Sequence, residues 1–276
     1  MSLRSIDPSM SPAIVARIDT LLDRVAAEHG VFLPLAIESG SRAWGFPSPD
    51  SDYDCRFVFV RPIVQHLTPW TPRDVIEFPP QGDLDVNGWD LGKALRLMLR
   101  GNAVIIEWLC SPIIYRGEGW FRDAFLELAR RAATRGAIGR HYLHLGERQR
   151  RVHFSDEGNV PLKKIFYALR PAAAVRWLRQ RPGESVAPMH FPTLMAECDP
   201  PADVRDIVAE LMERKAATRE LGTAPLPPAV ATFIDTEFVL AETAFPSSRA
   251  HPAGDMVGAA ERLYRYVTER LDSTPV

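Results

Sequence analysis

Residues 38–60 place the strongest constraint on how this chain folds. The segment Tyr53–Val60 is rich in aromatic and β-branched side chains, and apolar residues occupy both of its faces beyond an acidic start. This pattern predicts a central strand that is covered on both sides. Such a strand needs neighbouring strands and helices, so the stretch implies a sheet with helices packed on it.

Two carboxylates, Asp52 and Asp54, stand where this strand begins. Residues two apart in a strand point to the same face, about 7 Å apart along the chain. Their negative charges repel each other unless a cation lies between them. Upstream, Gly40-Ser41 forms a turn whose small residues leave backbone N–H groups free to approach an anion. We therefore predict a site for a metal-bound nucleoside triphosphate.

The segments around this stretch predict a mixed sheet flanked by helices. Further strands are expected over residues 31–37, 74–78, 83–89 and 113–115, with the last one at the sheet edge and a turn at 79–82. Helices are expected over 11–29, 41–44 and 91–99. The N-terminus of the helix at 41–44 would add a partial positive charge to the phosphate site.

From Trp120 onward the periodicity of the chain is helical. We predict helices over residues 119–132, 134–152, 160–180, 201–219, 227–243 and 254–271, with proline-rich loops at 181–192 and 223–228. The expected fold is α+β, with two domains. Residues 1–118 would form a domain built on a small mixed β-sheet that carries the predicted site, and residues 119–276 an all-helical domain that closes one wall of the active-site cleft.

Composition restricts the partners of the chain. With 25% charged residues and a net charge of -2, the chain has no general attraction to nucleic acid, so a polyanionic partner needs a local basic patch. Three widely separated cysteines without a CxxC pair fit a reducing cytoplasm rather than a disulfide framework or zinc site. No segment approaches the ~20 apolar residues of a membrane span. We expect a cytoplasmic protein without a membrane partner.

A third carboxylate is expected on the strand at 83–89. Alternation along this strand allows either Asp83 or Asp85 to join the pair. Asp90 is another acidic residue nearby, but its position before a predicted helix is fully explained by an N-cap role. Three clustered carboxylates can hold two Mg²⁺ ions about 4 Å apart, because Mg²⁺ prefers oxygen ligands and completes its shell with phosphates and water.

These motifs, in this order, resemble the signature of the DNA polymerase β-like nucleotidyltransferase superfamily: a Gly-Ser turn, then Ser51-Asp-Tyr-Asp54 entering an apolar strand. A longer set of segments resembles, more narrowly, the RNA-ligase-associated nucleotidyltransferase family. These segments are Glu38–Gly45, Ser48–Asp54, Gly88–Leu91 with Lys93, Glu107–Pro112, Leu162–Pro171 and Trp177. The resemblance covers roughly residues 31–222.

The resemblance implies a catalytic and metal-binding set of three carboxylates, in which Asp52 and Asp54 form the pair. The spacing from Gly88-Trp-Asp90 favours Asp85 as the third. The implied reaction transfers a nucleoside monophosphate from a nucleoside triphosphate such as ATP to a hydroxyl acceptor, with release of pyrophosphate and two Mg²⁺ ions as cofactors. One ion would lower the pKa of the attacking hydroxyl, and the other would neutralise the leaving pyrophosphate.

Further residues are candidates for contacts with the triphosphate or the acceptor. Gly40 and Ser41 would hold the β- and γ-phosphates through the turn. The basic candidates are Arg42, Lys93, Lys163, Lys164 and Arg170. Arg42 and Arg56 either contact phosphate or pair with a nearby carboxylate. Glu107 lies in an apolar segment, and because a buried carboxylate needs a partner, we predict a salt bridge to a lysine or arginine lining the cleft.

Three functions are compatible with these residues. The leading one is the nucleotidyl transfer described above, with RNA as a candidate acceptor. The second is a regulatory module that binds a nucleoside triphosphate without turnover, although a complete carboxylate set argues against it. The third is an antitoxin-type nucleotidyltransferase that modifies a partner protein.

Overall fold

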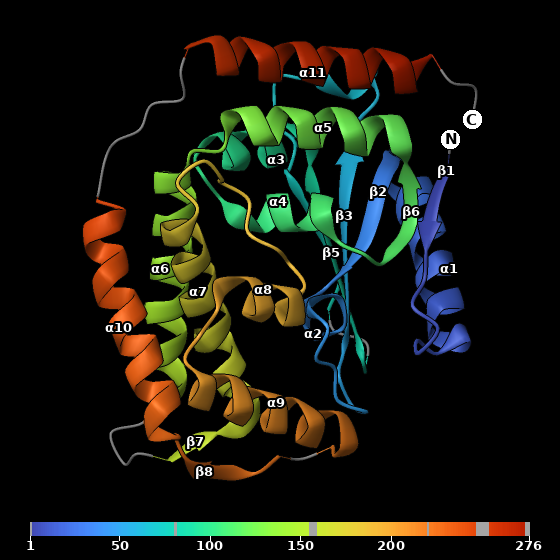
Figure 1. Cartoon of the computed structure of the whole chain (residues 1–276). Coiled ribbons are helices and arrows are strands. Elements are labelled where there is room, and N and C mark those ends of the chain that lie inside the picture. The colour runs from blue at the N-terminus through green and yellow to red at the C-terminus, as the bar shows by residue number, and fades with distance from the viewer. Residues whose placement is uncertain (1, 80–81, 155–158, 220, 247–253, 274–276) are drawn as a thin grey trace.

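The computed structural model describes residues 2–79, 82–154, 159–219, 221–246 and 254–273. A six-stranded mixed sheet stands beside a group of helices, and a C-terminal helix crosses back over the sheet half (Figure 1). The predicted α+β class is confirmed. The turn predicted at 79–82 includes residues 80–81, which lie outside the described residues.

The sheet has the strand order β1-β6-β2-β3-β5-β4. Its strands are β1 (Ser2–Ser5), β2 (Phe32–Ser39), β3 (Tyr53–Val60), β4 (Val75–Glu77), β5 (Leu84–Asp90) and β6 (Ile114–Glu118). Only β3 and β5 are parallel neighbours, and β3 is central as predicted. The edge position predicted for the strand at 113–115 is wrong, because β1, which we did not predict, pairs with the outer side of β6.

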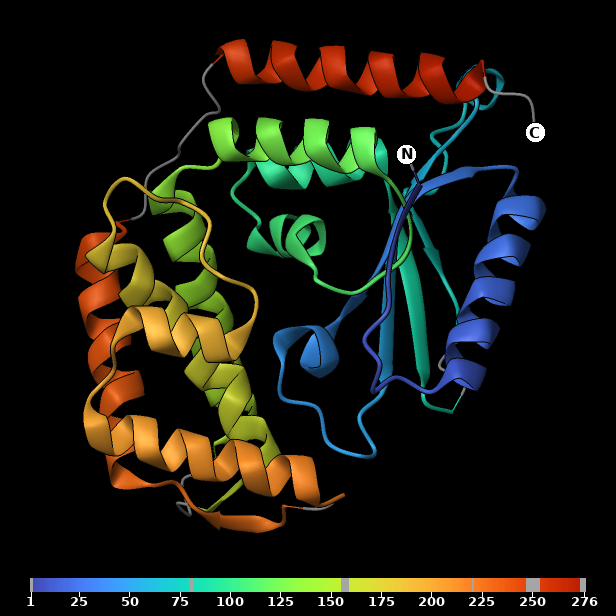
Figure 2. The ribbon, with the colours of Figure 1, turned by 45° about the vertical axis from the view of Figure 1, so that its right-hand side comes forward.

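Helices cover the two faces of the sheet unequally (Figure 2). Helix α1 (Pro12–His29) packs alone on one face, against Cys55, Phe57 and Phe59 of β3. The other face carries α3 (Leu91–Leu99), α4 (Ala103–Cys110) and α5 (Gly119–Ala132). Residues of β3 alternate between these layers, so Asp54 and Arg56 share the second face with Val58.

Most of the remaining helices form the second half around α7 (Leu162–Gln180), which contacts three other helices. The others are α6 (Arg135–His153), α8 (Phe191–Cys198), α9 (Ala202–Ala217) and α10 (Pro228–Ala244). Helix α8 was not predicted. The expectation of a purely helical half also needs correction, because β7 (Asn159–Pro161) and β8 (Thr223–Pro225) pair into a two-stranded sheet.

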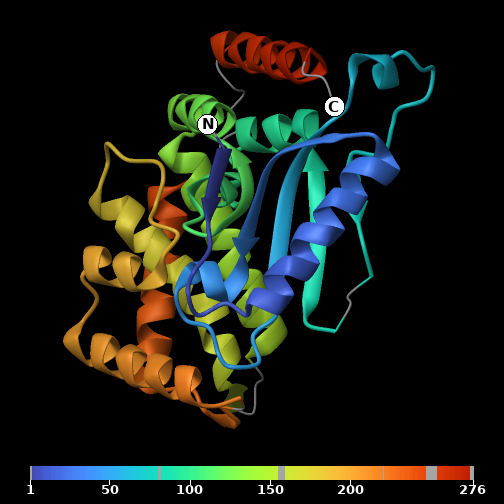
Figure 3. The same cartoon turned by 90° about the vertical axis from the view of Figure 1, so that its right-hand side faces the viewer.

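Helix α11 (Gly254–Asp272) returns to the sheet half (Figure 3). It packs against α5, α3 and the short 3-10 helix η1 (Ile63–His66). The division into two domains at residue 118 stays a prediction. Among the described residues, no helix has the length and apolarity that a membrane crossing requires.

Candidate active site

The predicted phosphate turn is a helix start placed directly against the strand that carries the acidic pair. Helix α2 (Gly40–Trp44) begins where β2 ends, as predicted for residues 41–44. Gly40 has φ +67°, and a Cβ on it would lie 2.0 Å from Asp54 Oδ2, so only glycine fits there. The backbone of the turn therefore lies in contact range of the Asp54 carboxylate.

Asp54 and Asp85 are neighbours in the sheet. The parallel register of β3 and β5 pairs these two residues directly, and Asp52 precedes the strand as an exposed residue. Burial raises the pKa of Asp54, the positive charge of Arg56 lowers it, and the charges of Asp85 and Asp52 raise it again. This is the electrostatic signature of carboxylates crowded into one partly desolvated site.

Of the three candidates for the third carboxylate, only Asp85 lies beside Asp54. The Asp83 carboxylate lies 3.6 Å from Arg17 of α1, the helix that covers the other face of the sheet. Asp90 is the N-cap of α3, where its Oδ1 accepts the N–H of Gly92 at 2.8 Å. The position of Asp85 beside Asp54 agrees with the choice that the family resemblance favoured, and its role as third carboxylate stays a prediction.

A guanidinium holds this carboxylate pair. Arg56 Nη2 donates to Asp85 Oδ2 at 2.7 Å and to Asp54 Oδ1 at 3.2 Å, and Arg56 Nη1 donates to the carbonyl of Asp85. Its side chain is 15% exposed, against 27% for Asp54 and 42% for Asp85. Of the two roles considered for Arg56, the structure shows pairing with carboxylates.

The loop between α2 and β3 is held by Ser41 and Arg42. Ser41 Oγ donates to Ser51 Oγ at 3.0 Å, so its hydroxyl ties the turn to the start of the acidic motif. Arg42 donates to the carbonyls of Ser51 and Asp52, and its guanidinium lies 4.0 Å from the centre of the Tyr53 ring. Both side chains therefore shape the loop, and their contacts with phosphate stay predictions.

A buried glutamate lies beneath the acidic motif, and sequence reasoning missed it. Glu38 is fully buried, accepts the N–H of Asp54 at 2.9 Å and accepts the hydroxyl of Tyr115. Burial raises the pKa of Glu38 to about 8, although both hydrogen bonds oppose the rise. A charged residue inside an otherwise apolar strand segment was the available signal. Glu38 positions the backbone of Asp54.

Helix α7 brings basic residues near the acidic motif. Lys163 pairs with Asp50 at 2.9 Å, and Lys164 lies 4.8 Å from the centre of the Tyr167 ring. Burial raises the pKa of Tyr167, and the negative charges of Asp54 and Asp52 raise it further. The two lysines thus lie on the helix that faces the acidic motif.

Lys215 is a second residue that sequence reasoning missed. It is buried, and its Nζ donates from α9 to the carbonyl of Phe46, which follows α2, at 2.5 Å. Burial lowers the pKa of Lys215 to about 8, and the positive charge of Lys163 adds to this effect. The contact joins the helical half to the loop of the phosphate turn.

Two residues predicted to contact phosphate have other partners in the structure. Arg170 is buried and donates to Glu107 Oε1 at 2.7 Å, which is the salt bridge predicted for Glu107, and this pairing argues against a contact with phosphate. Lys93 pairs with Asp74 at 3.1 Å and lies on α3, which begins where β5 ends. Asp85 is near the start of β5, and the five residues from Asp85 to the end of the strand span about 16 Å.

The site fits Mg²⁺ only together with substrate oxygens. Among the described residues, no three side chains of His, Cys, Asp or Glu are grouped as a complete metal site. The donors present are carboxylates, and Mg²⁺ usually binds through one or two carboxylates plus phosphates and water. Arg56 bridges the carboxylates of Asp54 and Asp85, so its positive charge already reduces the repulsion between them.

The site combines three features: carboxylates on two neighbouring parallel strands, a Gly-Ser helix start beside them, and a helix with two lysines nearby. This combination is typical of the class of polymerase β-like nucleotidyltransferases. The family model described as the RNA repair pathway DNA polymerase beta family matches residues 14–265, and the chain belongs to this family. The chain is also similar to the uncharacterized protein YcgL of Bacillus subtilis (strain 168), with 34% identity over 92% of this chain and 96% of that protein. The resemblance drawn from the motifs is thus confirmed.

Proposed function

We propose that the chain transfers a nucleoside monophosphate from a nucleoside triphosphate to a hydroxyl acceptor, with RNA as the acceptor and Mg²⁺ as the cofactor. One observation carries the proposal. Asp54 and Asp85 stand in register on adjacent parallel strands. Asp54 follows Asp52 by two residues and lies against the glycine turn at the start of α2. This arrangement offers oxygen ligands on one side and backbone N–H donors on the other.

In the proposed reaction the acceptor hydroxyl attacks the α-phosphorus of the triphosphate. The bond from that phosphorus to the oxygen bridging it to the β-phosphate breaks, pyrophosphate leaves, and the hydroxyl proton passes to the Asp85 carboxylate. Asp52 and Asp54 would hold Mg²⁺ together with the phosphates. When bound, Mg²⁺ supplies Lewis-acid stabilisation of the negative charge on the phosphate oxygens.

The cationic side chains near the acidic motif would position the triphosphate. The N–H groups at Gly40 and Ser41 belong to a helix N-terminus, which favours phosphate. Lys163 and Lys164 on the opposite helix carry charge that matches the leaving pyrophosphate. Because this contact draws on both halves of the chain, binding of the triphosphate would hold the two walls together.

The proposal is tested by measuring which acceptor receives the labelled α-phosphate of the nucleoside triphosphate. Purified chain is incubated with Mg²⁺ and each α-labelled nucleoside triphosphate, in the presence of RNA, protein or metabolite fractions. We expect label in RNA and release of pyrophosphate, both abolished by Asp52→Ala with Asp54→Ala. The matched control is Asp83→Ala, which removes a carboxylate that faces α1.

Each other outcome contradicts part of the proposal. Label in protein would make the chain a protein-modifying nucleotidyltransferase. Binding of ATP with Mg²⁺, but no pyrophosphate with any fraction, would identify a catalytically silent binding module. Unchanged release in the double variant, with an unchanged melting temperature, would remove the carboxylates from the mechanism.

A further inference from the structure

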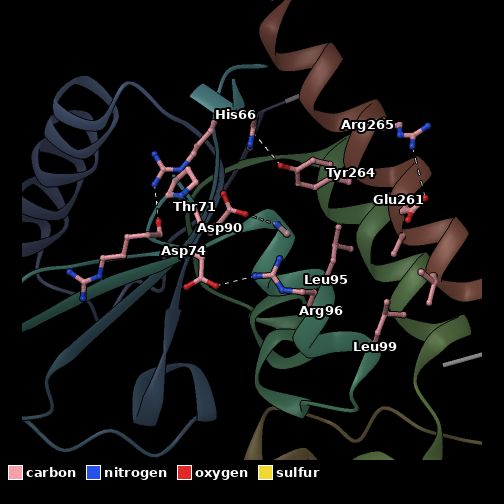
Figure 4. Close-up of a pocket in the computed structure, with 16 residues that line it drawn as sticks. His66, Thr71, Asp74, Asp90, Leu95, Arg96, Leu99, Glu261, Tyr264 and Arg265 are labelled. Atoms are coloured by element: carbon pink, nitrogen blue, oxygen red, sulfur yellow. Dashed lines mark hydrogen bonds and ion pairs between the residues drawn. The ribbon is translucent and has the colours of Figure 1, made fainter. Parts of the chain in front are cut away.

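A pocket of about 810 Å³ lies at the opposite end of the sheet from the carboxylates. It is open to solvent and is lined by residues of α3, α11 and the segment 61–74 (Figure 4). β3 and β5 run in parallel from the acidic motif toward it, so Asp90, which lines the pocket, stands about 16 Å along the strand from Asp85. The proposed transfer reaction makes no use of this pocket.

One side of the pocket is apolar. Leu95 and Leu99 from α3 line it together with Val257, Ala260 and the ring of Tyr264 from α11. Figure 4 shows the leucines and Tyr264 on facing walls. Two apolar walls supplied by facing helices suit a flat ring system, because such a ring buries both of its faces at once.

The polar end contains a carboxylate oxygen that lacks a donor. Asp90 Oδ1 accepts the N–H of Gly92, whereas no donor to Oδ2 is found in the part of the chain that the structure describes. Burial raises the pKa of Asp90, and the charges of Arg61, His66 and Arg96 oppose the rise. Asp90 lines the open pocket, so an amino group of a ligand could reach this oxygen and donate to it.

Cations exceed anions around this carboxylate. Lys93 and Arg96 share the single carboxylate of Asp74, at 3.1 and 3.0 Å. Arg61 is held by Gln65 and by the carbonyl of Arg73, and it has no carboxylate partner among the described residues. The spare positive charge of Arg61 and Arg96 fits an anionic group on the same ligand.

We propose that this pocket binds a nucleotide unit whose base carries an exocyclic amino group. The base would lie between the leucines of α3 and the residues of α11, its amino group would donate to Asp90 Oδ2, and its phosphate would pair with Arg61 and Arg96. Free nucleoside monophosphates and the terminal nucleotide of an RNA share this chemistry. This inference is independent of the reaction proposed at the carboxylates.

The test titrates the full chain with AMP, GMP, CMP and UMP by calorimetry at pH 8, without divalent metal. We expect the three nucleotides with amino-bearing bases to bind more tightly than UMP, because the ring N–H of uracil stands between two carbonyl oxygens that the Asp90 carboxylate repels. Arg61→Gln should weaken AMP about tenfold, because it removes a charge-assisted hydrogen bond. Val257→Trp, at a residue that is 41% exposed, should block the pocket without disturbing the core. Lys163→Gln, at the carboxylate site, should leave these affinities unchanged.

Asp90→Asn tests the base contact itself. Asparagine caps a helix as well as aspartate does, so the fold should be kept. Its Nδ2 would replace the acceptor oxygen with a donor, and the preference should invert toward UMP. A merely structural role for Asp90 would not produce this inversion.

Some results would overturn the proposal. One is that no nucleotide binds at millimolar concentration. The other is that Lys163→Gln removes binding, whereas Arg61→Gln and Val257→Trp leave it intact. An unchanged base preference in Asp90→Asn would overturn the base contact. A 5′-phosphorylated oligoadenylate pentamer that binds at least tenfold more tightly than AMP would identify an RNA end as the source, and equal affinity would identify the free nucleotide.

Discussion

The guanidinium of Arg56 lies 2.7 Å from the Asp85 carboxylate and uses the same nitrogen to reach Asp54. One side chain thus neutralises two acidic residues that neighbouring strands bring together. The relationship gives the site a stable form without metal, because two partly buried carboxylates would otherwise stand unpaired. A Mg²⁺ ion bound as proposed would therefore compete with Arg56 for these carboxylates.

Arg56→Gln should make folding more dependent on Mg²⁺. Without metal, we expect the free energy of unfolding to fall by about 1–2 kcal/mol, because the carboxylates lose their cation. Added Mg²⁺ should then stabilise the variant more than the wild type. Urea denaturation with and without Mg²⁺ measures both effects. Arg73→Gln, which breaks an exposed ion pair with Glu77, is the control and should change little. Equal stabilisation of variant and wild type by Mg²⁺ would argue against the competition.

Asp85→Asn and Asp83→Asn should differ sharply in activity, although the two residues are two apart in sequence. Asp85 lies beside Asp54, whereas Asp83 faces Arg17. We expect Asp85→Asn to lower kcat for pyrophosphate release by at least about 100-fold, as for loss of a general base. Asp83→Asn should stay close to wild type. The reverse order would assign the third carboxylate to Asp83.

Glu38→Gln should remove a pH dependence of stability. The pKa of Glu38 in the folded state is about 8, above the ordinary 4.5, so the folded state binds the proton more tightly. The contribution of Glu38 to stability is therefore complete below pH 4.5 and is lost as the pH rises to about 8. The free energy of unfolding of wild type should fall relative to Glu38→Gln across this window, by up to about 1.4 kcal/mol per pH unit. Parallel curves for the two proteins would contradict the assignment.

Arg170→Met should destabilise the chain without a specific effect on catalysis. Among the described residues, the substitution leaves buried Glu107 with one hydrogen-bond partner, the hydroxyl of Tyr142 at 2.6 Å. We expect a loss of about 3–5 kcal/mol in the free energy of unfolding, and recovery of most of it in the double variant Glu107→Gln with Arg170→Met. Guanidinium denaturation measures both. If the Arg170→Met variant stays folded and its KM for the triphosphate rises, the result would support the predicted contact between Arg170 and phosphate.

Local patterns in the sequence predicted the central elements well. β3 spans the predicted residues, and α5, α6, α7, α9, α10 and α11 lie within two residues of the predicted bounds. These elements are long and regular, and their periodicity reports which face is buried regardless of partner. The four-residue strand β1 and the short α8 carry too few periodic positions for such a pattern.

The sequence by itself determined the residues of the acidic motif and their order: a Gly-Ser turn, two carboxylates at the start of a strand, and further carboxylates on a later strand. Only the tertiary structure decided which residues meet. Asp85 joins Asp54 because β3 and β5 are parallel and in register. The same strand direction carries Lys93 to the far end of the sheet, and packing buries Arg170 and Glu38. The physical reason is that residue type and spacing are local, whereas strand direction and burial depend on contacts between segments far apart in the chain.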